Sequence, residues 1–140
     1  MRKTLLLLLM IPFLGFGQTK TVKEYYDNGQ LLSEINYADG QRNGLCENYW
    51  KNGQLWGGGN YRDGKMVGVW KSYYENGQLK EEGSYKYTEA GVYSRKDGVW
   101  KSYYESGELN IESVIKDGVQ VKYISYEKDG SITPMGEGGC

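Results

Sequence analysis

Short segments of alternating apolar and polar residues run along most of the chain, and glycine-containing turn pairs separate them. Over residues 69–85 the alternation has a period of two, which is typical of half-buried β-strands. Asn76-Gly77 divides this stretch, and Asn-Gly favours a two-residue type I′ hairpin turn because both positions need positive φ. The pattern therefore predicts a β-hairpin with these facing pairs: Trp70 and Gly83, Tyr74 and Leu79.

This register divides the hairpin into two faces, because successive side chains of a strand point to opposite sides. The mostly apolar face carries Trp70, Ser72, Tyr74, Leu79, Gly83 and Tyr85. The mostly charged face carries Lys71, Tyr73, Glu75, Gln78, Lys80 and Glu82. A glycine opposite Trp70 leaves room for the indole to lie across the backbone.

The same hairpin occurs four times, with its turn glycines at Gly29, Gly53, Gly77 and Gly107. A fixed period in this range indicates an array of small supersecondary units. Eleven residues after three of these glycines come the second turns, Asp39-Gly40, Asp63-Gly64 and Asp117-Gly118. The turn at Asp63-Gly64 is expected to pair Tyr61 with Met66 and Gly57 with Trp70. The registers set by the two turns both place the Trp70 side chain on the same face of the sheet. The sequence therefore predicts an all-β fold, a single meandering antiparallel sheet of successive β-hairpins.

The third repeat is six residues longer than its neighbours. A turn at Ala90-Gly91 adds three residues to each strand and keeps the register, which predicts a hairpin over 85–97 that projects roughly 10 Å beyond the others. An irregular loop over 86–96 is the alternative. After Asp117-Gly118, a return strand is expected to contain Val121, Tyr123 and Ile124, and Asp129-Gly130 indicates one last turn.

The ends of the chain differ from the array. A cationic start precedes an almost unbroken apolar run from Leu5 to Phe16, too short to span a bilayer stably, and Gly15 and Gly17 have the spacing that signal peptidase reads. We expect a cleaved secretory signal over 1–17, a repeat domain over 18–133, a flexible tail over 134–140, and a periplasmic or extracellular location. A retained N-terminal anchor is the alternative.

Composition and charge narrow the classes of partner. Cleavage leaves 15 Lys and Arg against 18 Asp and Glu, a net charge of −3, because the first 17 residues remove two of the 17 basic residues and no acid. A mildly acidic chain argues against nucleic acid and gives no cationic field for anionic lipid. Cys46 is expected to be a buried small hydrophobe and Cys140 a free terminal thiol, with a link between two chains as the alternative for Cys140.

Residues for catalysis are not found together. The chain has no His, which excludes His-based triads and His zinc ligands. The glycine run 57–59 falls in mid-strand, not before a helix, so it is not expected to hold phosphate. Glu75 and Glu105 recur at hairpin ends, where a solvated charge is the simpler explanation. We therefore expect no enzyme, no cofactor and no metal site.

One tyrosine per hairpin lies on the charged face: Tyr25, Tyr49, Tyr73 and Tyr103. Successive hairpins lie ~10 Å apart, so these residues form a ladder, interleaved with Lys23, Glu47, Lys71 and Lys101. Tyrosine is favoured at interfaces, and the ladder is the candidate binding site. In the alternative, the rings only cover their expected cross-strand neighbours Leu32, Trp56, Lys80 and Asn110.

The apolar face has no predicted helix to cover it. It is expected to carry Val22, Tyr26, Leu31, Ile35, Trp50, Leu55, Trp70, Tyr74, Leu79, Trp100, Tyr104, Leu109 and Ile111. Such a patch is larger than a soluble monomer normally exposes. We expect a strongly twisted or curled sheet whose aromatic rows cover one another, with pairing of two sheets in a homodimer as a second hypothesis.

The unit Gly68-Val69-Trp70-Lys71-Ser72-Tyr73-Tyr74-Glu75-Asn76-Gly77-Gln78-Leu79, followed by Tyr85 and an Asp-Gly turn, resembles the bacterial variant of the MORN repeat. The chain is most similar to proteins of the YwqK-type antitoxin family, over about residues 20–130. The resemblance implies a sheet of successive hairpins and a binding role: toxin neutralisation in bacterial relatives, membrane-associated scaffolding in eukaryotic ones. Two features depart from the pattern: Cys46, where a Trp is expected, and the long third hairpin. The export signal is a further departure, because an antitoxin must share a compartment with its toxin.

Three functions follow as hypotheses. The first is an exported, non-enzymatic module for protein interaction or scaffolding, in the manner of an antitoxin or immunity protein. The second is a glycan or cell-wall module, because Trp-x-x-Tyr-Tyr hairpins also resemble choline-binding repeats. The third is binding to a membrane surface, which the net charge of the chain disfavours.

Overall fold

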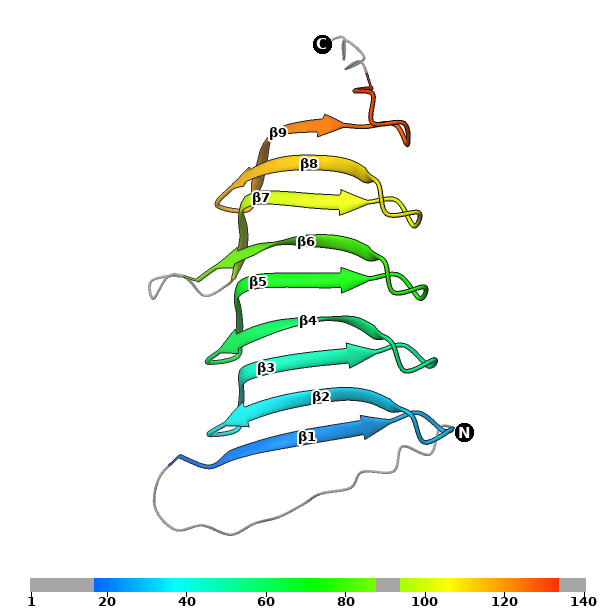
Figure 1. Cartoon of the computed structure of the whole chain (residues 1–140). Helices are drawn as coiled ribbons and strands as arrows, with labels where there is room; N and C mark the ends of the chain where they lie inside the picture. The colour runs from blue at the N-terminus through cyan, green and yellow to red at the C-terminus, as the bar shows by residue number, and fades with distance from the viewer. Residues whose placement is uncertain (1–16, 88–93, 134–140) are drawn as a thin grey trace.

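The computed structural model describes residues 17–87 and 94–133, and its regular elements there are β-strands in one sheet. The strands are β1 (Thr19–Tyr25), β2 (Leu31–Ala38), β3 (Gln41–Tyr49), β4 (Leu55–Arg62), β5 (Lys65–Tyr73), β6 (Leu79–Lys86), β7 (Arg95–Tyr103), β8 (Leu109–Lys116) and β9 (Val119–Ser125). Each strand pairs antiparallel with the next one along the chain, and β1 and β9 form the two edges (Figure 1). The predicted meandering all-β sheet is confirmed.

The Asp-Gly turns at Asp39-Gly40, Asp63-Gly64 and Asp117-Gly118 are two-residue turns, as predicted for Asp63-Gly64, and have type I′ geometry. Both residues of each of these three turns take positive φ, for example 49° at Asp63 and 75° at Gly64. Asp tolerates this region better than most residues, and Gly adopts it without a steric cost. Tyr61 consequently pairs with Met66, as expected.

A bulge follows each of these turns and changes one predicted pair. Between Gly58 and Asn60 the register of β4 against β5 shifts, so Gly57 faces Ser72 and the predicted Gly57–Trp70 pair is wrong. The extra residues on β5 include Gly68, which has a φ of 67°. Bulges bend a strand and increase its twist. Figure 1 shows the result, because β3, β5 and β7 bend sharply near their starts and the sheet is curled.

The Asn-Gly turns are not the predicted two-residue turns. The amide of Tyr74 donates to the carbonyl of Gln78 (2.8 Å) and the amide of Gly77 donates to that of Tyr74 (2.9 Å). This closes a three-residue loop in which Gly77 has a φ of 86° while Asn76 keeps a negative φ. Such a loop is a type I turn followed by a glycine bulge. The predicted Tyr74–Leu79 pair is therefore wrong, and Leu79 faces Tyr73.

The tryptophans pack on glycines, as expected, but on those of the preceding hairpin. Trp70 is the register partner of Gly83, which confirms the pair. Its indole, however, lies on Gly59, where an added Cβ would collide with the ring. Trp100 covers Gly83 in the same way. The glycines thus make room for an indole from the next repeat along the array.

The aromatic side chains of the Trp70 face form a continuous row along the sheet. Tyr61, Trp70, Tyr85 and Trp100 meet edge to face, with ring centroids 5.2 to 6.2 Å apart. Edge-to-face contacts of this kind are favourable, and they cover apolar surface that would otherwise meet water. The buried hydrophobic side chains of the described residues are few: Ile35, Cys46, Trp100 and Ile115. Mutual covering within one curled layer therefore replaces a deep core.

The third hairpin keeps the predicted register over Ser84–Lys86 and loses it at a bulge between Glu82 and Ser84, so that Glu82 faces Lys101. Ser84, Tyr85 and Lys86 face Asp97, Lys96 and Arg95. The expected turn at Ala90-Gly91, most of the expected signal segment, the tail over 134–140 and Cys140 lie outside the described residues. The predicted return strand is β9, and the amide of Gly130 donates to the carbonyl of Glu127 (2.9 Å) in the last turn.

Candidate binding surface

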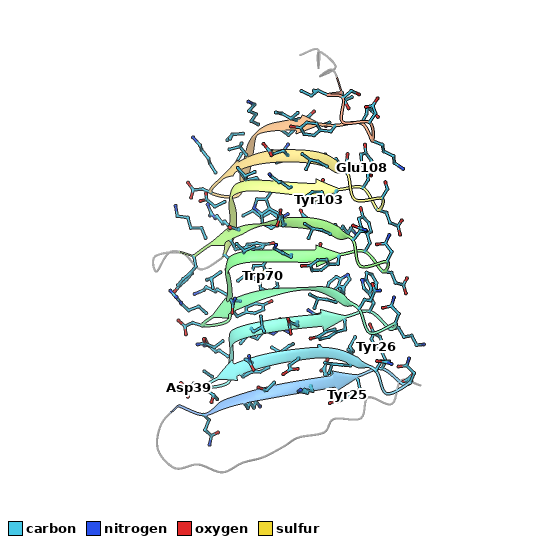
Figure 2. The ribbon with its side chains drawn as sticks, viewed as in Figure 1. Tyr25, Tyr26, Asp39, Trp70, Tyr103 and Glu108 are labelled. Atoms are coloured by element: carbon cyan, nitrogen blue, oxygen red, sulfur yellow. The ribbon has the colours of Figure 1, made fainter. Side chains whose placement is uncertain are left out.

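The four predicted tyrosines lie in one row. Tyr25, Tyr49, Tyr73 and Tyr103 are the last residues of β1, β3, β5 and β7. Figure 2 shows Tyr25 and Tyr103 at the ends of their strands next to the three-residue turns, on the side of the sheet opposite the turn that holds Asp39. All four tyrosines take the same position at the end of every second strand. Every second strand of an antiparallel meander lies ~10 Å from the last, so the tyrosine side chains have this spacing.

The cross-strand partners of these tyrosines are leucines. Tyr25, Tyr49, Tyr73 and Tyr103 face Leu31, Leu55, Leu79 and Leu109. The expected neighbours Leu32, Trp56, Lys80 and Asn110 are wrong, because each is the additional residue of a second bulge, directly after the leucine that faces the tyrosine. The tyrosines are half-buried, so each ring packs on its surroundings and also exposes part of its edge.

Two of the hydroxyl groups are bound to carboxylates. Tyr49 donates to Glu47 (2.9 Å), and burial together with this carboxylate raises the pKa of Tyr49 to about 12. Tyr103 donates to Glu82 (3.0 Å), and burial and that carboxylate likewise raise its pKa. These hydrogen bonds fix the orientation of the rings, and a fixed aromatic ring loses less conformational entropy on binding.

Ion pairs run beside the tyrosine row on the same face. Lys23 pairs with Glu34 (3.0 Å), Lys71 with Glu82 (3.2 Å) and Lys101 with Glu112 (3.4 Å). Burial acts to raise the pKa of Glu82, but hydrogen bonds from Lys71 and Tyr103 outweigh it and hold this pKa below its ordinary value. The face is therefore neutralised locally and presents no field of one sign.

A row of exposed aliphatic residues, which the sequence reasoning missed, completes the surface. Leu45, Val69 and Val99 are 44, 55 and 50% exposed. Each stands four residues before a ladder tyrosine on the same strand, and alternation of side chains places it on the tyrosine face. The signal in the sequence is their recurrence directly after the bulge glycines Gly44, Gly68 and Gly98. We call the three parallel rows (tyrosine, ion-pair and aliphatic) the tyrosine face.

The second aromatic residue of each repeat has a role that differs from the predicted packing on leucine. Tyr26, Tyr74 and Tyr104 donate their hydroxyl groups to the carbonyls of Tyr49, Tyr103 and Tyr126, and the indole of Trp50 donates to that of Tyr73. These bonds connect consecutive hairpins at the ends of the odd-numbered strands. They hold the ladder tyrosines, whose carbonyls are the acceptors at three of the four positions, at a fixed spacing.

The described residues do not bring metal-binding side chains together. Within 17–87 and 94–133 no cluster of three or more His, Cys, Asp or Glu side chains is placed to hold a metal ion. In the same ranges no helix is long and apolar enough to cross a membrane. Cys46 is buried and free, as predicted, and burial raises the pKa of its thiol, so it remains protonated at neutral pH.

Comparison with family models matches the chain to the MORN repeat variant at residues 18–39, 42–65, 66–87 and 96–117. These four segments cover more than half of the chain, and the first, second and fourth end at or next to an Asp-Gly turn. A search of curated proteins found no match.

Proposed function

Since the chain belongs to the MORN repeat variant family, whose repeats generally serve as protein- or membrane-binding modules, we propose that it is an exported, non-enzymatic module that binds a protein through its tyrosine face. The supporting observation is the row of four half-buried tyrosines at equal strand ends, held in register by hydrogen bonds between hairpins. Tyrosines beside a neutralised row of ion pairs and an exposed aliphatic row are typical of a protein interface.

Within this function, the finer proposal is a neutralising role of the kind that the antitoxin resemblance implies. A partner toxin then has to reach the compartment to which the chain is exported. The ion pairs, which leave no single-sign field, support a protein partner over nucleic acid and anionic lipid.

The experiment is a pull-down from envelope extract with the purified chain and with the double variant Tyr49→Ala/Tyr73→Ala. We expect the double variant to lose the captured protein, because truncation of two central tyrosines removes the anchors of the interface. The matched control is Tyr123→Ala, which removes an exposed tyrosine of β9 away from the row. Circular dichroism of each variant checks the sheet.

Equal capture by the double variant and the wild-type chain would exclude the tyrosine face as the site. Sedimentation with anionic liposomes tests the membrane alternative, and tryptophan fluorescence during titration with cell-wall fragments tests the glycan alternative. A response in either assay that Tyr49→Ala/Tyr73→Ala abolishes would replace the protein partner by that ligand.

A further inference from the structure

Among the residues that the structure describes, the sheet is open at both ends, and each end presents a strand with one unpaired edge. These strands are β1 and β9. An unpaired edge exposes a row of backbone N–H and C=O groups that another strand can bind. The two edges differ in regularity, and the sequence of β1 identifies what can bind to its edge.

The free edge of β1 is regular. The carbonyl of Gln18 accepts from Asp39 (3.2 Å) and the amide of Tyr26 donates to Gln30 (2.8 Å), so both residues point toward β2 or its turn. The N–H and C=O of one residue point the same way, and this direction alternates along a strand. The residues whose backbone groups point outward are therefore Thr19, Thr21, Lys23 and Tyr25. The bulge in this hairpin is at Leu32, on β2, so it leaves the alternation of β1 intact.

The free edge of β9 is interrupted. Val121 has no register partner on β8, because Lys122 faces Val114 while Gln120 faces Ile115. A bulge in the edge strand itself disrupts the alternation of backbone groups and protects the edge from pairing. At the end of β9, the carbonyl of Ser125 already accepts from the amide of Thr133 (2.9 Å).

The sequence of β1 is complementary to itself in one antiparallel register. With Val22 facing Val22 of a second copy, Lys20 faces Glu24 and Thr19 faces Tyr25, each pair occurring twice. No like charges face each other. In the same register, the residues whose backbone groups point away from β2 face one another across the two copies as hydrogen-bonded pairs. These pairs give about eight N–H···O bonds. A register shifted by two residues loses the Lys20–Glu24 pairs.

We propose that β1 is a homodimer interface, in which two copies of the chain join antiparallel about Val22. The two sheets then form one continuous sheet, related by a two-fold axis perpendicular to it. Such an axis leaves both tyrosine faces on the same side. The dimer therefore presents two binding faces to one partner or one surface, and bivalent attachment strengthens binding without new contacts.

The first test is the mass of the purified full chain by sedimentation velocity over a concentration series. We expect a dimer at tens of micromolar, a monomer for Lys20→Glu because like charges then face each other twice, and a dimer again for Lys20→Glu/Glu24→Lys. The matched control Lys122→Glu changes the other edge and is expected to remain dimeric. A monomeric wild-type chain, or a dimer lost in Lys122→Glu but kept in Lys20→Glu, would overturn the proposal.

The second test fixes the register. Val22 faces its symmetry mate at a non-hydrogen-bonded position, where Cα atoms lie ~4.5 Å apart, within the range that a disulfide spans. In a Cys140→Ser background, we expect Val22→Cys to cross-link nearly all of the chain under mild oxidation. Lys23→Cys, one residue further, has Thr21 as its partner and is expected to remain uncross-linked. Equal cross-linking of the two variants, or none in Val22→Cys, would exclude the Val22 register.

Discussion

At the scale of single residues, the side chains at two facing positions of the repeat are matched in size. Trp70 and Trp100 lie on Gly59 and Gly83, whereas Cys46, in the position of these tryptophans, faces Ile35, in the position of the glycines. Cys46 and Ile35 are both buried. The departure of Cys46 from the repeat pattern is therefore compensated across the sheet, which the sequence reasoning did not recognise because it expected Trp70 on its own register partner.

This size matching predicts strong coupling between the two sites. Cys46→Trp alone is expected to lower the free energy of unfolding by about 1–3 kcal/mol, because the indole meets Ile35 in a filled site. Ile35→Gly alone leaves a cavity and a flexible backbone, and is expected to cost about 2–5 kcal/mol. The double variant recreates the Trp–Gly arrangement and is expected to be more stable than the sum of the single changes by about 1–3 kcal/mol. Urea denaturation measures this coupling, and additive losses would contradict it.

The raised pKa of Tyr49 predicts a loss of stability at high pH. An ordinary tyrosine has a pKa of 10.0, and burial with Glu47 raises that of Tyr49 to about 12. Below the ordinary value the folded and unfolded chains are both protonated, so the stabilising contribution is complete. Between the two values only the unfolded chain loses the proton, so the free energy of unfolding falls as pH rises. Denaturation at about pH 9 and about pH 11 is expected to show a smaller fall in Tyr49→Phe than in the wild-type chain. An equal fall in both would contradict this assignment.

At the scale of the elements, the two kinds of turn show how far the sequence reasoning reached. Asp-Gly and Asn-Gly are both signals for two-residue turns. The predicted two-residue turn is confirmed at Asp63-Gly64 and is wrong at Asn76-Gly77. The glycine alone takes positive φ in the longer turn, and the side chain of Asn76 accepts from the amide of Gln78 (2.9 Å). Sequence pairs specify that the chain turns, but not the loop length. Asp129-Gly130, which is also an Asp-Gly pair, forms the longer loop, because the amide of Glu127 donates to the carbonyl of Ser131 (2.8 Å) and the amide of Gly130 donates to that of Glu127 (2.9 Å).

The hydrogen bonds between hairpins predict the effect of removing a single hydroxyl group. Tyr74 donates to the carbonyl of Tyr103 (2.8 Å) across two strands. Tyr74→Phe keeps the ring and removes this donor, so the free energy of unfolding is expected to fall by about 0.5–1.5 kcal/mol. Thermal denaturation compares it with Tyr123→Phe, which changes an exposed tyrosine of β9 and is expected to stay within about 0.5 kcal/mol of the wild-type chain. An unchanged midpoint in Tyr74→Phe would mean that packing alone fixes the hairpin spacing.

At the scale of the whole molecule, the sequence period predicted the order of the strands and the row of tyrosines, because both depend only on repetition and on which side of a strand a residue lies. The curl and the aliphatic row were not predicted in detail. The curl arises at the bulges that contain Gly44, Gly68 and Gly98, where positive φ breaks the alternation on which the sequence reasoning relied. The aliphatic residues directly after these glycines keep their alternation with the tyrosines, but the sequence reasoning did not consider their exposure. Glycine within a strand indicates such a site without giving the number of residues that it adds.

The linear order of the strands makes stability local, since each strand packs mainly against its neighbours in the chain. A perturbation of one hairpin is therefore expected to spread only to those beside it. Gly83→Ala places a methyl group against the indole of Trp100, and overpacking of this kind costs about 1–3 kcal/mol. Hydrogen exchange followed by mass spectrometry is expected to show roughly 5- to 150-fold lower protection in β6 and β7, with β2 and β3 little changed. The control Asn60→Ala, which changes an exposed residue of β4, is expected to leave the profile unchanged. A uniform loss across all nine strands would mean that the sheet opens as one cooperative unit.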